Sequence, residues 1–258
     1  MNLLVVGAGE MGRWLADTVA AADEPTAEIA FLDVDPAVAR DAAADRNARQ
    51  VDPETTERFD CVCLAVPMSA VESAIEQHAP LADRAVFDLS GVMDRPLAAL
   101  NTHAPDCERA SFHPLFAPPR VPGNVAVVTA SGGPLLTDIR RAMADAGNTV
   151  FETTAAEHDR AMETVQAGAH TAVLAYALVA GDVRDEFATP VSNQLTEIAR
   201  TVTEGSPAVY AEIQSTFDGA DAVADAAAAI ADANDETFAA LYETAKEHVG
   251  GERRERHE

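Results

Sequence analysis

Short apolar runs alternate with amphipathic stretches over the first 152 residues of this 258-residue chain. The runs have the length and composition of buried parallel strands, and apolar residues recur at helical spacing in the stretches between them. The predicted strands are Asn2–Val6, Glu28–Leu32, Asp60–Val66, Arg84–Leu89, Glu108–Phe112, Asn124–Thr129 and Thr149–Glu152. The predicted helices are Arg13–Ala22, Pro36–Arg49, Ser69–His78, Pro96–His103 and Leu135–Ala146. This alternation predicts an α/β fold with a Rossmann-type, doubly wound and mostly parallel sheet.

The pattern becomes helical after residue 152. The predicted helical segments are Thr154–Gly181, Thr189–Glu204, Pro207–Phe217 and Ala220–His248. We therefore expect a dinucleotide-binding domain over 1–152, a helical substrate-binding and dimerisation domain over 153–250, and a disordered charged tail over 251–258. A homodimer is expected because a few Ala-rich helices bury little core by themselves.

A glycine-rich turn joins the first predicted strand to the first predicted helix. Its sequence, Gly7-Ala8-Gly9-Glu10-Met11-Gly12, has the G-x-G-x-x-G spacing of a dinucleotide-binding loop. Gly7 permits the tight turn, Gly9 lets the backbone approach a pyrophosphate, and Gly12 lets helix and strand pack closely. The helix start then directs unpaired N–H groups at the phosphates. The alternative is a glycine turn in a nucleotide-free α/β domain.

Asp33 follows the second predicted strand, roughly 20 residues beyond the last glycine, where a carboxylate binds the adenosine ribose. It would repel a 2′-phosphate, and no arginine follows before Arg40. NAD is therefore expected in preference to NADP. The alternative is that Asp33 only caps the helix beginning near Pro36. Val66 and Pro67, at the end of the strand over 60–66, complete the predicted cofactor-binding residues.

The chain carries 43 acidic and 18 basic residues, a net charge of −25. Such a charge opposes binding to nucleic acid or anionic membranes, and it destabilises a compact fold unless salt screens it. We expect a salt-adapted, cytoplasmic protein, with an ordinary acidic enzyme as the alternative; no secretory signal or membrane-spanning run is recognised. Cys61, Cys63 and Cys107 lack the spacing of a disulfide framework or zinc site, and no metal is expected.

Two candidate catalytic residues follow predicted strands, at the edge of the sheet where ligands bind. His113 could accept the proton of a substrate hydroxyl, since a histidine titrates near neutrality. The alternative is a loop histidine bonded to backbone. Ser90 follows the strand over 84–89.

The helical half adds candidate substrate-binding residues. His158, Met162, Gln166 and His170 recur every four residues, so they share one helix face that predicts either a polar wall for substrate or a paired helix interface. Arg200 could hold a substrate carboxylate through its planar guanidinium. The alternative for Arg200 is an exposed helix-face ion pair.

Together these motifs resemble the prephenate dehydrogenase family of tyrosine biosynthesis. The matching segments are Gly7–Trp14, His113–Pro118, the run from His158-Asp159-Arg160 to Gln166 and His170, and Pro207–Ile213. The resemblance implies NAD(P)-dependent oxidative decarboxylation of prephenate to 4-hydroxyphenylpyruvate by a homodimer. It implies that His113 polarises the ring C4 hydroxyl, that Arg200 binds the ring carboxylate, and that His170 lies near the pyruvyl side chain.

The chain departs from the family pattern in two places. Many members carry Ser-Val-Lys where this chain has Gly91-Val92-Met93, so Ser90 is expected to take over the serine's contact with substrate or His113. A second arginine of some members is missing from Val191–Gln194, which leaves arogenate as an alternative substrate. A non-catalytic redox sensor is the alternative from another class. A β-hydroxyacid dehydrogenase is disfavoured because the sole lysine, Lys246, lies near the C-terminus.

Overall fold

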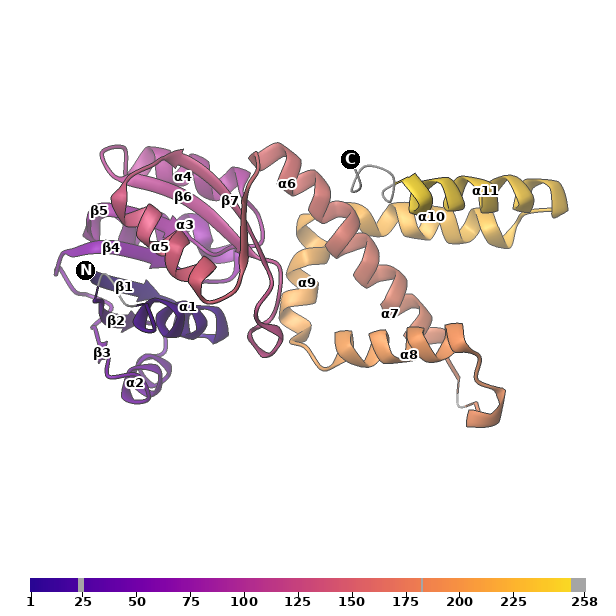
Figure 1. Ribbon diagram of the computed structural model, residues 1–258, viewed down its shortest axis with the longest axis horizontal. Coiled ribbons are helices and arrows are strands. Elements are labelled where there is room, and N and C mark those ends of the chain that lie inside the picture. Colours follow the sequence, from indigo (N-terminus) through magenta and orange to yellow (C-terminus); the bar gives the residue numbers. More distant parts are fainter. Residues whose placement is uncertain (23–25, 182, 252–258) are drawn as a thin grey trace. The chain divides into compact units, whose positions relative to one another are not determined.

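The computed structural model describes residues 1–22, 26–181 and 183–251. The chain divides into two compact units, Met1–Ala161 and Met162–Glu258 (Figure 1). The sequence-based boundary follows residue 152, nine residues earlier than the observed one. The difference arises because helix α6 (Ala155–Met162) belongs to unit 1 except for its last residue. Within the described ranges, no helix is both long and apolar enough to cross a membrane.

A sheet of eight strands in the order β3-β2-β1-β4-β5-β6-β7-β8 forms the centre of unit 1. All neighbouring strands are parallel except β6 and β7. The strands are β1 (Asn2–Val6), β2 (Glu28–Leu32), β3 (Arg49–Gln50), β4 (Phe59–Leu64), β5 (Ala82–Asp88), β6 (Glu108–Pro114), β7 (Asn124–Ser131) and β8 (Thr149–Glu152). The predicted Rossmann-type, mostly parallel sheet is confirmed.

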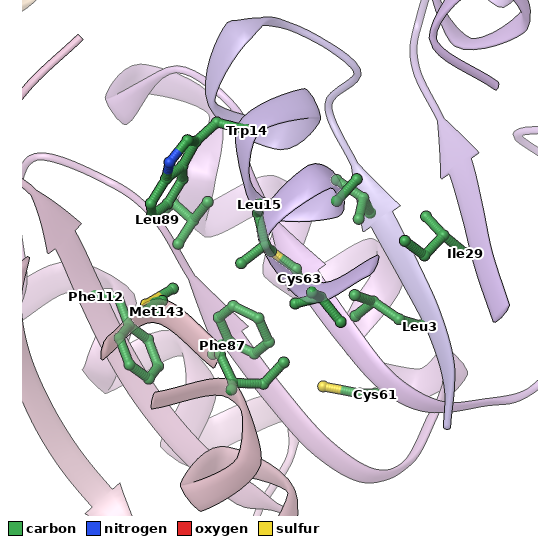
Figure 2. Packing of buried hydrophobic residues seen from close by; sticks show 14 of the residues in the cluster. Leu3, Trp14, Leu15, Ile29, Cys61, Cys63, Phe87, Leu89, Phe112 and Met143 are labelled. Carbon is green, nitrogen blue, oxygen red and sulfur yellow. The ribbon is translucent and has the colours of Figure 1, made fainter. Parts of the chain in front are cut away.

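Helices cover both faces of this sheet because successive strand residues point to opposite sides. Leu3 and Val5 belong to a buried cluster with residues of α1, α2 and α5, whereas Leu4 and Val6 belong to one with residues of α3 and α4. Figure 2 shows Leu3 in the first cluster, together with Leu15 of α1 and Met143 of α5. The helices of unit 1, besides α6, are α1 (Glu10–Ala20), α2 (Pro36–Ala44), α3 (Val71–His78), α4 (Asp94–His103) and α5 (Pro134–Asp145), with 3-10 turns η1 (Met68–Ala70), η2 (Ala79–Leu81) and η3 (Pro118–Arg120).

One predicted helix of unit 1 is too long. Helix α2 ends at Ala44 rather than Arg49, and the chain turns through Asn47 at a positive φ of 50°. Residues 49 and 50 then form the short edge strand β3, which the sequence does not predict.

Unit 2 is helical in its described part, as predicted. Its elements are the π-helical segment η4 (Glu163–Gly168), α7 (Ala169–Val179), the 3-10 turn η5 (Asp185–Phe187), α8 (Pro190–Thr203), α9 (Pro207–Thr216), α10 (Gly219–Ala231) and α11 (Asp235–Gly251). The predicted helix over 220–248 is two helices, since Asn234 accepts a hydrogen bond from the Thr237 N–H at 2.9 Å and begins α11 anew. Gly251 ends α11, and the rest of the predicted tail lies outside the described residues.

The predicted helix over 154–181 is interrupted by η4. A side-chain carbon at Gly219 would lie 1.8 Å from the carbonyl oxygen of Glu163, so only glycine lets α10 pack this closely. The Gln214 amide donates to the carbonyl of Ala167 at 3.1 Å and accepts from the Thr171 hydroxyl at 2.9 Å. These contacts stabilise the π-helical turn, a feature often found at functional sites.

Candidate active site

The glycine turn between β1 and α1 leaves open space in front of the helix. Gly7 has φ +96°, and a Cβ there would lie 2.3 Å from the carbonyl oxygen of Ala65. A Cβ at Gly12 would lie 2.0 Å from the carbonyl oxygen of Gly7. A Cβ at Gly9, by contrast, meets no described atom within 4 Å. Gly7 and Gly12 are therefore required by packing, while Gly9 keeps room for a ligand.

The start of α1 fits a dinucleotide phosphate. Gly9 is the N-cap and makes no side-chain cap hydrogen bond, so the N–H groups of the first turn, which includes Glu10 and Met11, suit an anion. Arg13 is not directed at this space, because its guanidinium donates to the carbonyl oxygens of Ala8 at 2.8 Å and Val38 at 3.3 Å.

Asp33 lies directly beside the glycine turn. Its carboxylate accepts from the Ala8 N–H at 2.8 Å and from the Asp35 N–H at 3.0 Å. The helix cap of α2 is instead Asp35, which accepts from the Ala37 N–H at 2.9 Å. The alternative cap role of Asp33 is therefore wrong, and its carboxylate is fixed at the turn.

Val66 and Pro67 follow β4 at the same edge of the sheet. The neighbouring Ala65 donates its N–H to the carbonyl oxygen of Val6 at 2.7 Å. The structure therefore brings together all the predicted cofactor-binding residues, which are Gly7–Gly12, Asp33, Val66 and Pro67.

A buried carboxyl group lies at the carboxyl ends of β5 and β6. Asp88 is fully buried, and its Oδ1 accepts from the N–H of Ser90 at 2.9 Å and the hydroxyl of Ser111 at 3.1 Å. Its Oδ2 has no hydrogen-bond partner. Burial raises the pKa of Asp88 to about 7, although the hydrogen bonds from both serines lower it.

The Ser90 hydroxyl lies between two acceptors. It is 2.7 Å from Asp88 Oδ1 and 2.7 Å from the carbonyl oxygen of Val92, and its one proton is donated to these two oxygens. The Ser90 hydroxyl thus bonds to Asp88 and Val92, and its catalytic role stays a prediction.

His113, near the end of β6, heads a buried chain of hydrogen bonds. Its Nδ1 lies 2.8 Å from His158 Nε2, and His158 Nδ1 lies 2.7 Å from Asp159 Oδ1. Asp159 also accepts from the backbone N–H groups of Met93 at 3.0 Å and Asp94 at 3.2 Å, where α4 begins. Burial raises the pKa of Asp159, but the hydrogen bonds from His158 and this backbone outweigh it and lower the pKa overall.

This chain of hydrogen bonds determines the tautomers of the His113 and His158 rings. Asp159 as a carboxylate can only accept, so His158 Nδ1 carries hydrogen, and in neutral His158 the Nε2 accepts from His113 Nδ1–H. The lone pair of His113 is then on Nε2, as a base requires. Burial and the neighbouring His158 lower the pKa of His113 to about 3, against the opposing influence of Asp159.

His158 is bonded to protein groups through both ring nitrogens, and the residue is 3% exposed. The ring therefore positions His113, and its direct contact with substrate stays a prediction.

Gly91 lies beside the Nε2 edge of the His113 ring. A Cβ at Gly91 would be 3.5 Å from His113 Nε2 and 2.9 Å from the Met68 Sδ. Beyond the strand, Phe116 packs edge-on against Trp14 of α1 with ring centroids 5.2 Å apart. This contact ties the His113–Pro118 segment to the helix that starts at the glycine turn.

Unit 2 holds the other candidate residues. His170 packs edge-on against Tyr210, with ring centroids 4.8 Å apart, and its buried Nδ1 has no hydrogen-bond partner. Burial lowers the pKa of His170, so the ring is a neutral polar group. Gln166, one turn earlier in η4, is half-buried.

Arg200 forms an exposed ion pair on its own helix, which is the alternative given above to binding a substrate carboxylate. Its guanidinium pairs with Glu197 on the same helix, and its side chain is 64% exposed. The contacts described within unit 2 do not direct it into a buried site, so its carboxylate-binding role stays a prediction.

Sequence reasoning missed Asp159 and Gly91 as parts of the site. Asp159 stands in the His158-Asp159-Arg160 motif, but no spacing rule indicates that it caps a helix distant in sequence. Gly91 was identified only as the place where a family serine is missing. The contact with His113 that gives Gly91 its significance depends on the pairing of β5 with β6.

Comparisons with known proteins agree with this arrangement. Residues 2–90 match the protein family described as "NADP oxidoreductase coenzyme F420-dependent". A curated relative from Streptomyces pristinaespiralis, 4-amino-4-deoxyprephenate dehydrogenase, is 31% identical over 268 aligned residues, covering 93% of this chain and 88% of the relative.

Solved structures share the whole fold at lower identity. Prephenate dehydrogenase from A. aeolicus, crystallised with hydroxyphenyl propionate and NAD+, is 14% identical with a TM-score of 0.70, covering 99% of this chain and 93% of the other. Synechocystis arogenate dehydrogenase is 14% identical with a TM-score of 0.67, covering 98% and 99%. With a relative above 30% identity along most of both chains, this protein belongs to the prephenate dehydrogenase family of oxidoreductases.

Proposed function

We propose that the protein is an NAD-dependent dehydrogenase that oxidises a prephenate-type substrate at ring C4, with loss of the ring carboxylate. The observation that carries the proposal is the buried His113–His158–Asp159 chain, in the same unit as a dinucleotide-type glycine turn. Prephenate would give 4-hydroxyphenylpyruvate. Arogenate is an alternative substrate, and the name of the Streptomyces relative adds the analogue with a C4 amino group.

NAD would be held by the edge formed by Gly7–Gly12, Asp33, Val66 and Pro67. The open position at Gly9 fits a pyrophosphate, and the fixed carboxylate of Asp33 suits ribose hydroxyls while repelling a 2′-phosphate. When bound, the cofactor supplies the acceptor for the hydride that leaves substrate C4.

His113 accepts the hydrogen bond from the C4 substituent through Nε2. Its burial keeps the ring neutral at physiological pH, so the lone pair is present without prior deprotonation. His158 and Asp159 hold the ring in this tautomer and stabilise positive charge that develops on it. By accepting this hydrogen bond, His113 would raise the electron density on the oxygen or nitrogen bonded to C4, and this electron density promotes departure of the hydride from the C4–H bond.

Residues of unit 2 would bind the rest of the substrate. We assign the pyruvyl side chain to His170, whose buried and unpartnered Nδ1 suits a ligand, with Gln166 beside it. Arg200 would exchange its exposed pairing with Glu197 for the ring carboxylate.

A second copy of the chain would cover the apolar surface of unit 2. Helix α7 is apolar, yet none of its residues is buried, and Leu178 and Val179 are 87% and 81% exposed. Surfaces of this kind mark protein–protein contacts. A homodimer through these helices is the arrangement that would bury them.

The test is NAD reduction by purified protein in molar KCl, with prephenate, arogenate and 4-amino-4-deoxyprephenate offered separately. Turnover of at least one substrate, lost in His113→Asn while NAD affinity barely changes, would support the proposal. NAD binding without turnover of any substrate would indicate a redox sensor instead. Loss of NAD affinity in His113→Asn would contradict the role given to His113.

A further inference from the structure

We infer that Asp88 is a positioning residue for the proposed reaction, and that it acts on His113 through the Ser90 hydroxyl and the β5–α4 segment (residues 89–93). The inference rests on the proposed function, in which His113 accepts a hydrogen bond from the substrate. Asp88 is fully buried and takes no direct part in the chemistry assigned to His113.

Asp88 lies on the same face of the sheet as His113. It pairs with Ser111 across β5 and β6, and His113 follows Ser111 by two residues on β6. Because side chains alternate along a strand, Ser111 and His113 point to the same face, where the Ser111 hydroxyl donates to Asp88 at 3.1 Å. The buried carboxyl group is therefore placed to act on the base through protein groups.

The Ser90 hydroxyl links this carboxyl group to the β5–α4 segment. Asp88 Oδ1 accepts from the N–H of Ser90 at 2.9 Å and from its hydroxyl at 2.7 Å. The same hydroxyl lies 2.7 Å from the carbonyl oxygen of Val92, and all three residues are buried. A buried polar group that loses its partner is costly, so these contacts hold the segment in one shape.

The segment in turn places the first N–H groups of α4. Those of Met93 and Asp94 donate to the Asp159 carboxylate at 3.0 Å and 3.2 Å. That carboxylate lies 2.7 Å from Nδ1 of His158, whose Nε2 lies 2.8 Å from Nδ1 of His113. A displaced segment would move the donors that fix the carboxylate, and the orientation of the base depends on that carboxylate.

The segment also borders the base directly. A Cβ at Gly91 would lie 3.5 Å from Nε2 of His113, the nitrogen assigned to the substrate. The shape of the segment therefore bears on both ring nitrogens, on Nε2 through Gly91 and on Nδ1 through the chain of hydrogen bonds.

A neutral side chain at position 88 is sufficient for this role. The described hydrogen bonds from Ser90 and Ser111 all go to Oδ1, and Oδ2 is buried without a hydrogen-bond partner. Burial raises the pKa of Asp88 to about 7, which favours the neutral form below neutrality. An asparagine oxygen accepts the same bonds, whereas alanine accepts none.

The experiment measures kcat/KM, NAD affinity and the unfolding midpoint, using the substrate that the wild type turns over best. Ser90→Ala and Asp88→Ala should each lower kcat/KM about tenfold because the base loses its alignment. Asp88→Asn should recover activity to within about threefold of wild type. Ser111→Ala is the matched control and should stay in that range, since it removes a bond to Asp88 from a strand that β5 and β7 hold on both sides.

Coupling to Asp159 separates positioning from a general loss of stability. Ser90→Ala combined with Asp159→Asn should be little worse than Asp159→Asn alone, because both act on the same chain of hydrogen bonds. This comparison decides the question even where Asp88→Ala fails to fold. Additive losses would overturn the inference, since Ser90 would then act independently of that chain.

Two other results would also overturn the inference and leave the proposed function standing. One is full activity in folded Asp88→Ala, and the other is a loss in Ser111→Ala equal to that in Ser90→Ala. A wild-type protein that turns over no substrate would overturn both the inference and the proposed function.

Discussion

Replacing Asp159 by Asn tests whether the buried hydrogen-bond chain works as a unit. The substitution keeps the size of the side chain and removes its charge. The side-chain oxygen of Asn can still accept hydrogen bonds on one side. Its NH2 group then faces another donor, which is the backbone N–H of Met93 or Asp94 or the Nδ1–H of His158, and the two donors cannot form a hydrogen bond. We therefore expect His158 to lose its fixed tautomer, and His113 to lose the orientation that depends on it.

The size of the effect follows from the geometry. Asp159 Oδ1 lies 2.7 Å from His158 Nδ1, and the two imidazole centroids are 5.0 Å apart. A positive charge about 4 Å from the carboxylate on His158, or about 9 Å away on His113, is stabilised by roughly 4 or 2 kcal/mol at an effective dielectric constant of about 20. Asp159 is partly exposed, so the lower figure applies, and kcat/KM should fall about 30-fold.

The assay is steady-state NAD reduction with the best substrate, together with NAD affinity and the unfolding midpoint of each variant. Glu157→Gln is the matched control, because it removes the same charge from an exposed residue two positions before Asp159, where the side chain bonds to Thr153. It should keep full activity. A His158→Gln, Asp159→Asn double variant should be little worse than either single variant, as expected for groups acting together. An Asp159→Asn enzyme within threefold of wild type would refute the reasoning.

Three further outcomes follow from the structure. Between about pH 4 and 7, Asp88 should make stability fall with rising pH, because its folded pKa of about 7 lies above the usual 3.8 of an aspartate. His113 should make stability rise over the same range, because its folded pKa of about 3 lies below the usual 6.5 of a histidine. Asp88→Asn should therefore give a steeper rise of stability with pH than wild type in denaturant titrations, and parallel curves would contradict the raised pKa of Asp88. Gly9→Ala should fold normally, since its Cβ meets no described atom within 4 Å, yet bind NAD at least about tenfold more weakly in a fluorescence titration; undiminished NAD affinity would place the phosphates elsewhere. The unfolding midpoint should rise between dilute and molar KCl because the net charge is −25, and a flat response would contradict salt adaptation.

The fold could be predicted because its signals are local and periodic. The apolar run Asn2–Val6, the glycine turn and the helix after it form one contiguous pattern, and each later strand repeats the alternation. The errors lie where tertiary contacts override propensity. The Ala-rich stretch after Pro36 continues a helical pattern beyond Ala44, but residues 49 and 50 gain more by pairing with β2 than by extending α2.

The active site could be predicted less well because its contacts join segments distant in sequence. His113 was recognised from its place after a strand, whereas the role of His158 depends on a contact spanning 45 residues. The four-residue spacing of His158, Met162 and Gln166 indicates a shared face but cannot show that the His158 ring bonds to His113. Ser90 and Gly91 show the same limit. Adjacent residues after a strand point in different directions, so the serine reaches a buried carboxyl group while the glycine faces the base. The significance of an absent side chain can be judged only once its neighbours in the fold are known.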